Sequence, residues 1–270
     1  MRNPTELAPA TLKDAIAFRL WSAKQIQSKA TFRLWYIKQV WRGERELRLV
    51  HSLSDPNRTT LDVGSNRGLY AVAALRFSKQ VIAFEPQPHF ASFLRQYLPP
   101  SIDVRECAVS DTAGTATLIV PADPRFHAEA RLSPAGDATS GTGPNFVPIV
   151  VPTMRLEDIV QDHVGLIKID VEGHEFAVLN GASKLIDSSR PNVIIEIENR
   201  HRPGAVSRAF QWFQAKQYRG YYLKDNALSP AENIGEEQGQ YPYNFIFLPV
   251  ERPPMMRASI FAALSGVLEL

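Results

Sequence analysis

From residue 59 onward, short apolar runs alternate along the chain with longer segments in which apolar residues recur at helical spacing. Short apolar runs are typical of buried strands, and a period near 3.6 residues is typical of helices packed on one side. Strand-like runs occupy 59–63, 80–84, 103–109, 166–170 and 192–198, and helical segments occupy 68–77, 88–98, 176–186 and 205–217. Strands that alternate with helices predict a doubly wound α/β fold.

Two further strand-like runs close this pattern. Residues 218–223 and 244–250 have no helical segment between them, so we expect these strands to pair antiparallel. The run 115–120 follows a turn-forming stretch after residue 109 and predicts a short hairpin. No internal repeat is visible in the sequence.

Residues 121–148 are rich in Pro, Gly, Ser, Thr and Asp and predict a long loop. A loop of this length inside a compact domain is usually functional. One hypothesis is a lid that orders over a substrate, with Arg125, His127 and Arg131 reaching inward. The alternative is a surface loop that has no functional role.

Both ends of the chain lie outside the alternating pattern. Residues 10–50 read as helical, basic and dotted with tryptophans. We interpret them as an amphipathic cap on the main domain, in preference to a nucleic-acid or anionic-membrane surface, because acidic and apolar residues are interspersed. The apolar tail 258–270 is too short to span a bilayer and is expected to dock on the domain or on a second subunit. These boundaries predict an extension over 1–54, a main domain over 55–250 and a tail over 251–270.

The composition is that of an ordinary globular protein: 270 residues, 44% hydrophobic and 21% charged, with a formal net charge of +2. Nucleic acid is therefore an unlikely partner. Cys107 is the single cysteine, which excludes an internal disulfide and suits a reducing compartment. No secretory signal or membrane span is recognisable, so a cytoplasmic location is expected.

The stretch after the first strand, Gly64-Ser65-Asn66-Arg67-Gly68, predicts a ligand-binding loop, since ligands of open α/β sheets sit at the carboxyl ends of the strands. Its G-x-x-x-G spacing departs from the dinucleotide pattern G-x-G-x-x-G. Asp62 precedes it by two residues and would repel a pyrophosphate but attract an ammonium or sulfonium group. Glu85 follows the second strand and can accept both hydroxyls of a ribose. S-adenosylmethionine carries an ammonium group, a sulfonium group and a ribose, so we expect it as the cofactor.

Six segments carry a resemblance to a known family: LDVGSNRGLYA, VIAFEPQP, CAVSDTAG, VPTMRLEDIV, LIKIDVEGHEFAVLNGA and RPNVIIEIENRH. In this order and spacing they resemble the FkbM-type methyltransferases over about residues 55 to 250. The resemblance implies a Rossmann-like class I fold with a seven-stranded sheet, the last strand antiparallel. It also implies O-methylation of a sugar or glycan hydroxyl or of a natural product.

The resemblance further implies which residues hold the cofactor. Asp62 and the loop residues Gly64, Ser65, Asn66 and Gly68 would lie at its methionine end, and Glu85 at the ribose. Cys107, Ala108 and Asp111 would lie near the adenine, where Cys107 serves as a pocket wall.

Residues at the end of the fourth strand, 166–170, are the candidates for chemistry. Methyl transfer to a hydroxyl requires alignment of the acceptor oxygen and removal of a proton. Asp170, Glu172 and His174 are candidate catalytic residues. His201 and His127 are less favoured candidates for the base. A divalent metal held by Asp170, Glu198 and Asn199 is an alternative that we do not favour.

Three functional hypotheses remain open. The first is an O-methyltransferase of a small molecule or glycan. The second is a methyltransferase of a macromolecule such as RNA or protein, and the third is a non-catalytic module that binds S-adenosylmethionine. A homodimer through the terminal helices is compatible with each of them.

Overall fold

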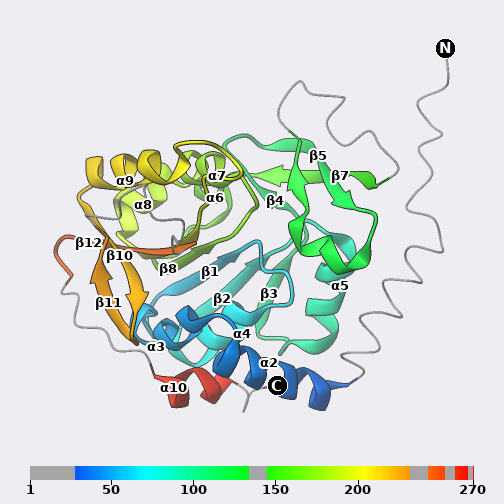
Figure 1. Cartoon of the computed structure of the whole chain (residues 1–270), viewed down its shortest axis with the longest axis horizontal. Coiled ribbons are helices and arrows are strands. Elements are labelled where there is room, and N and C mark those ends of the chain that lie inside the picture. The colour runs from blue at the N-terminus through cyan, green and yellow to red at the C-terminus, as the bar shows by residue number, and fades with distance from the viewer. Residues whose placement is uncertain (1–27, 134–144, 232–242, 253–258, 267–269) are drawn as a thin grey trace.

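The structure, a computed structural model, describes residues 28–133, 145–231, 243–252, 259–266 and 270. Residues 10–27 of the predicted N-terminal extension lie outside this description. The described residues form one large sheet with helices on both faces and a smaller sheet beside one end of it (Figure 1).

The large sheet has eight strands in the order β11-β10-β12-β9-β8-β1-β2-β3. They are β1 (Thr59–Val63), β2 (Gln80–Phe84), β3 (Ile102–Arg105), β8 (Val164–Ile169), β9 (Asn192–Glu196), β10 (Tyr218–Lys224), β11 (Ala227–Pro230) and β12 (Asn244–Pro249). Strands β3, β2, β1, β8 and β9 are parallel. The predicted antiparallel pairing of 218–223 with 244–250 is confirmed, because β12 lies antiparallel between β9 and β10. The predicted count of seven is wrong, because β11 adds an edge strand through a tight turn after β10.

Both faces of the large sheet are covered, and the strand residues alternate between two cores. Ile82 and Phe84 belong to one core, whereas Val81 and Ala83 on the same strand belong to the other. The first core is covered by α6 (Leu156–Ile159), α7 (Glu175–Gly181), α8 (Ser183–Ser189) and α9 (Ala205–Ala215). The second is covered by α4 (Leu69–Ala74), η2 (Leu75–Phe77) and α5 (Pro88–Tyr97) together with elements from both ends of the chain. Burial on both faces explains why these strands read as nearly continuous apolar runs.

The elements from the two ends are α2 (Lys29–Arg42), η1 (Arg45–Leu49), α3 (Val50–Leu53) and α10 (Ile260–Ser265). In α2, Phe32, Tyr36 and Val40 recur at four-residue spacing and are fully buried in the second core. The Tyr36 hydroxyl donates a hydrogen bond of 2.9 Å to the Ala263 carbonyl of α10. The two helices thus pack on each other and on the same core. No helix among the described residues is long and apolar enough to cross a membrane.

The small sheet corrects two sequence predictions. Its order is β4-β7-β5-β6, built from β4 (Ala108–Val109), β5 (Gly114–Pro121), β6 (Arg131–Leu132) and β7 (Phe146–Met154). The expected hairpin of 103–109 with 115–120 does not form, because β7 lies between β4 and β5 and pairs with both. The expected loop 121–148 contains η3 (Pro124–Glu129), β6 and the start of β7; its residues 134–144 lie outside the described residues. The Pro and Thr residues of β7 weaken its local strand pattern, and its partner strands lie far away in the sequence. The sequence pattern therefore did not predict this strand.

Candidate active site

The loop after β1 is fixed by a buried carboxylate. Asp62 Oδ2 accepts hydrogen bonds from Ser65 Oγ (2.7 Å) and from the Ala71 N–H of α4 (3.0 Å). Burial raises the pKa of Asp62 to about 6. Asp62 therefore ties the strand, the loop and the helix together, a structural role that is compatible with the predicted contact to a cation.

The glycines at the two ends of this loop meet different demands. Gly64 and Gly68 both have left-handed φ angles, +77° and +79°, which other residues adopt at a cost. A Cβ on Gly64 would lie 1.8 Å from the Asp170 carbonyl oxygen at the end of β8, and one on Gly68 would meet Leu98 at 2.6 Å. Gly64 thus brings the ends of β1 and β8 together.

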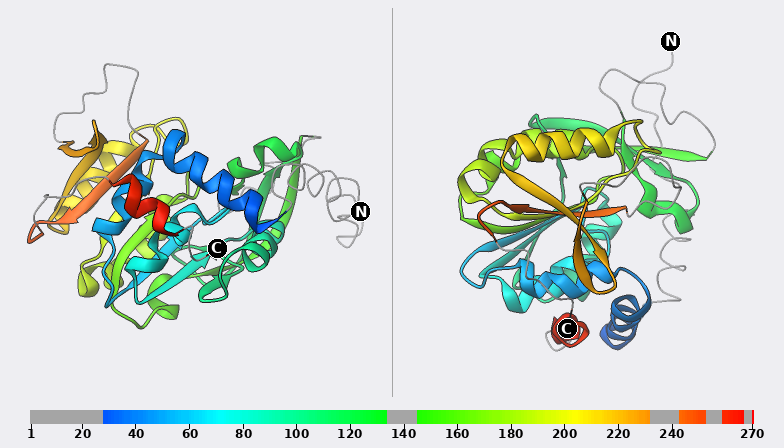
Figure 2. Two further views of the ribbon diagram at one scale, coloured as in Figure 1. Left: turned by 90° about the horizontal axis from the view of Figure 1, so that it is seen from below. Right: turned by 60° about the vertical axis from the view of Figure 1, so that its left-hand side comes forward.

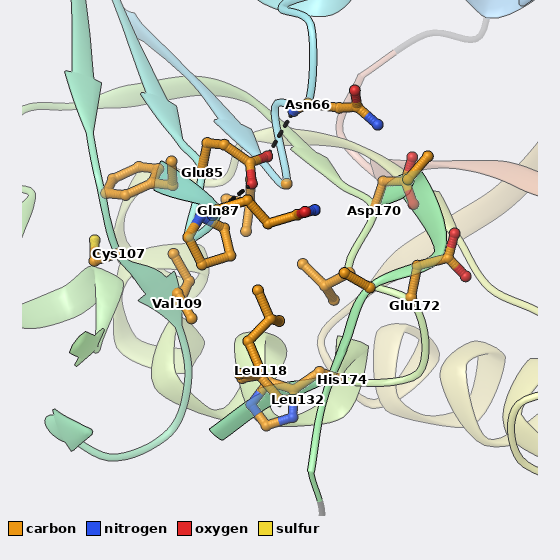
Figure 3. Close-up of a pocket in the computed structure, with 18 residues that line it drawn as sticks. Asn66, Glu85, Gln87, Cys107, Val109, Leu118, Leu132, Asp170, Glu172 and His174 are labelled. Carbon is orange, nitrogen blue, oxygen red and sulfur yellow. Dashed lines mark hydrogen bonds between the residues drawn. The ribbon is translucent and has the colours of Figure 1, made fainter. Parts of the chain in front are cut away.

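Glu85 lies at the end of β2, buried against the same loop. Its Oε2 accepts from the Asn66 N–H and its Oε1 from the Gln87 N–H, both at 2.8 Å (Figure 3). Burial raises the pKa of Glu85 to about 7. Each carboxylate oxygen keeps a second lone pair, so the group is oriented and can still accept hydrogen bonds from a ligand.

A pocket opens beside Glu85 and has one apolar side. Cys107, Val109, Leu118 and Leu132 line it opposite Asp170 and Glu172 (Figure 3). It also contains Ala108, Gly64, Asn66 and His174 of the predicted set. An apolar wall facing a few oriented polar groups is typical of a small-molecule site. The pocket has the features that an adenosine group requires.

Two of the residues predicted near the adenine behave differently. Cys107 is a buried wall residue, and burial raises the pKa of its thiol to about 11, so the thiol stays protonated at neutral pH. Asp111 is exposed and does not line the pocket; its carboxylate accepts a hydrogen bond from Ser110 Oγ. The prediction for Asp111 is therefore not supported by its position.

The predicted chemical residues meet at the end of β8, in the turn before α7. Asp170 and Glu172 line the pocket on the side across from Glu85 (Figure 3). Burial, followed by the negative charge of Asp170, raises the pKa of Glu172 to about 8. His201 Nε2 lies 3.0 Å from Glu172 Oε2. The sequence indicated His201 only as a less favoured candidate base, because it lies 29 residues after Glu172 and only the fold brings the two side chains together.

The two other predicted histidines have different surroundings. His174 Nε2 is 2.9 Å from Ser110 Oγ, and burial lowers the pKa of His174, which keeps it neutral. The ring of His127 packs near that of His89 at 5.0 Å between centroids. Within the predicted loop, Arg125 is exposed and paired with Asp123, and Arg131 is exposed. Leu132 and the alanines 128 and 130 line the pocket instead. The expectation that Arg125 and Arg131 reach inward is therefore wrong, whereas the His127 ring is partly buried against His89.

Asp170 and Glu198 of the metal alternative line one small cavity, but two of the three residues of that alternative hydrogen-bond to other groups of the protein. Glu198 accepts a 2.7 Å hydrogen bond from Arg200 Nε, and Asn199 Oδ1 accepts one of 3.2 Å from the Val206 N–H at the start of α9. Within the described ranges, no group of three or more His, Cys, Asp or Glu side chains has the arrangement of a metal site.

A second cavity, of about 210 Å³, lies on the other side of the glycine loop. It shares Gly64, Asn66 and Asp170 with the first pocket, so the two spaces meet at the ends of β1 and β8. Its other lining residues are Trp35, Gln39, Glu44, Asp62, Ser65, Arg67, Leu69, Tyr70 and Lys168. Its lining is largely polar and charged, in contrast to the apolar side of the first pocket.

Lys168 of β8 is the main residue of this second cavity that sequence reasoning missed. Its Nζ lies 3.6 Å from Asp170 Oδ2 and 4.9 Å from the centre of the Tyr70 ring. Burial alone would lower the pKa of Lys168, but surrounding carboxylates, Asp170 and Glu44 foremost, raise it above its ordinary value. The sequence signal that could have identified Lys168 is the presence of a charged residue within the apolar run LIKID.

The parallel sheet, the glycine loop at the end of β1 and the oriented acid at the end of β2 define the class of Rossmann-like nucleotide-binding proteins. The chain belongs to the FkbM methyltransferase family: the family's sequence model, described as the methyltransferase FkbM domain, matches residues 62–221. This match confirms the resemblance and supports methyl transfer as the activity.

Two characterised relatives share 25% sequence identity with the chain. One is the hexuronic acid methyltransferase AglP of Haloferax volcanii, aligned over 192 residues that cover 66% of this chain and 74% of AglP. The other is the methyltransferase sdnD of Sordaria araneosa, aligned over 171 residues that cover 52% of this chain and 66% of sdnD. Among solved structures, the FkbM methyltransferase of Methylobacillus flagellatus KT aligns with a TM-score of 0.46 and 15% identity, covering 87% of this chain and 59% of that protein.

Proposed function

We propose that this protein is an S-adenosylmethionine-dependent O-methyltransferase that acts on a hydroxyl of a sugar, glycan or natural product. The observation that carries the proposal is the oriented, buried carboxylate of Glu85 at the edge of a partly apolar pocket, opposite Asp170 and Glu172. The name of one relative, the hexuronic acid methyltransferase AglP, supports a sugar acceptor.

The residues present fit this cofactor. Glu85 would accept hydrogen bonds from the ribose hydroxyls, and the apolar wall around Cys107 and Val109 would hold the adenine. Asp62 and the second cavity would take the amino-acid end. When bound, the cofactor supplies an electrophilic methyl group on a positively charged sulfur.

The residues at the end of β8 would handle the proton of the acceptor. When the acceptor oxygen takes the methyl group that a bound cofactor would supply, its hydroxyl proton would pass to a carboxylate at this end of the sheet. Glu172 is our choice for this base, because its raised pKa of about 8 gives it a strong affinity for a proton. A cation in the pocket favours the ionised form of Glu172 before the reaction. Asp170 would help to orient the acceptor and to balance the positive charge.

The experiment is acceptor-dependent release of S-adenosylhomocysteine from purified protein with a panel of uronic acids, neutral sugars and hydroxylated natural products. Product analysis by NMR must reveal a methyl ether. Asp170→Asn is expected to reduce turnover while the affinity for S-adenosylhomocysteine is retained. Turnover abolished by EDTA and restored by magnesium would replace the base mechanism with a metal-assisted one. Cofactor binding without turnover of any acceptor class would favour the non-catalytic module.

A further inference from the structure

The outward face of α2 carries two large apolar side chains, although the helix buries its opposite face in the core. Leu34 is 68% exposed and Trp41 is 55% exposed. They lie seven residues apart, which places them on one side of a helix. Phe32, Tyr36 and Val40 point the other way into the protein. The core therefore does not explain why Leu34 and Trp41 are apolar.

Helix α10 also exposes a large apolar side chain. It lies beside α2 on the outside of the molecule (Figure 2) and presents Phe261 at 88% exposure, the highest value among the large hydrophobic side chains of the described residues. The two helices come from opposite ends of the chain. We call the face formed by Leu34, Trp41 and Phe261 the α2–α10 surface.

Basic residues accompany the α2–α10 surface. Lys29, Arg33, Lys38 and Arg42 are all exposed on α2, and none of them is paired with an acidic side chain in the described part of the chain. A helix with one apolar face, flanked by Lys and Arg and carrying Trp, is typical of segments that lie in the interface of an anionic membrane. Trp and Phe fit this interface because they bury apolar area at the level of the lipid headgroups.

We propose that the α2–α10 surface binds the surface of an anionic lipid membrane, on which the protein lies without crossing it. A second copy of the chain fits this surface less well. An isologous contact would bring the unpaired cations of one α2 against those of the other, and like charges in an interface oppose association. A lipid surface of negative charge complements the same cations and accepts the three apolar side chains.

The geometry also connects this surface with the candidate site. Trp35 and Gln39, on the flank of the same helix, line the second cavity at the glycine loop. A membrane bound to α2 would therefore lie close to the cofactor end of the site. The proposal concerns a different face of the molecule from the chemistry, so it stands whether or not the acceptor is a sugar.

The test is co-sedimentation of the full-length protein with large unilamellar vesicles, either pure phosphatidylcholine or a mixture with phosphatidylglycerol. We expect binding to the anionic vesicles, and weaker binding at high salt because the charges are exposed. Lys38→Gln combined with Arg42→Gln is expected to weaken partitioning by roughly 25-fold, about fivefold for each charge. Trp41→Ser combined with Phe261→Ser is expected to abolish detectable binding.

Val150→Ser provides the matched control, because Val150 of β7 is 74% exposed and lies in the small sheet, away from α2 and α10. It is expected to bind vesicles like the unchanged protein. Equal loss in the control, or absence of binding to anionic vesicles, would overturn the proposal. A stable dimer in sedimentation velocity that Trp41→Ser dissociates would assign the surface to a second copy instead. Unchanged thermal midpoints of the variants establish that they remain folded.

Discussion

Replacement of Glu85 by glutamine tests the cofactor site most directly, because it keeps the size of the side chain and removes its charge. In the unchanged protein each carboxylate oxygen accepts one backbone N–H at 2.8 Å and retains a lone pair for a ligand hydroxyl. Glutamine offers one acceptor oxygen and turns an NH₂ group toward the other backbone donor. The variant therefore loses a charged hydrogen bond to the cofactor, which contributes about 1.5–3 kcal/mol.

This loss corresponds to a weakening of about 10- to 150-fold in the Kd for S-adenosylhomocysteine, measured by calorimetry at pH 8. The pH dependence provides a second readout. Because the pKa of Glu85 is raised to about 7, the unchanged protein should bind more tightly as pH rises through 7, when the carboxylate ionises. Glu85→Gln should lose the part of this dependence that is centred near pH 7.

Glu129→Gln is the control, since Glu129 is an exposed glutamate of η3 outside the pocket. It should change neither the affinity nor its pH profile. If Glu85→Gln binds S-adenosylhomocysteine as tightly as the unchanged protein at both pH 5 and pH 8, Glu85 does not hold the ribose and the cofactor placement is wrong.

Three further predictions concern the loop, the base and the buried acid. Gly204→Ala should lower the free energy of unfolding by only the cost of its left-handed φ angle, about 1–2 kcal/mol, because nothing lies within 4 Å of the added Cβ. Gly64→Ala has the same φ cost and also meets the Asp170 carbonyl oxygen, so its loss in urea titrations should be larger; equal losses would reject the close approach to β8. Glu172→Gln should reduce kcat by about 10²- to 10⁴-fold with little change in cofactor Kd. The kcat of the unchanged protein should rise with pH at a value below 8, because the bound cation lowers the pKa of Glu172 from the value of about 8 in the free protein; a flat profile with full activity in the variant would exclude Glu172 as the base. Burial raises the pKa of Asp62 from 3.8 to about 6 in the folded protein. Between pH 3.8 and pH 6 the folded state therefore keeps a proton that the unfolded state has lost, and the free energy of unfolding falls as pH rises through this range. Relative to Asp62→Asn, the unchanged protein should lose up to about 3 kcal/mol between pH 4 and pH 7, and a constant difference across this range would show that the carboxylate is not held in a desolvated position.

The elements that carry strong local signals were predictable from the sequence. The apolar runs of β2, β8 and β9 are short and almost continuous, because helices cover both faces of the sheet. Gly64, Gly68 and Glu85 stand at fixed offsets from these strands, since a loop that approaches a ligand closely needs special backbone angles and an oriented acid. The family follows from the same segments, and the family match over residues 62–221 confirms it.

Only the tertiary structure decided which distant residues meet. The pairing of β7 with β4 and β5 replaces the expected hairpin, because strand pairing depends on partners remote in the sequence and not on local pattern. In the same way His201 comes within 3.0 Å of Glu172, and Lys168 becomes buried among carboxylates. Periodicity identified helix α2 but could not tell which of its apolar residues face the core. Packing against η1, α5 and α10 determined this, and it left Leu34 and Trp41 in solvent.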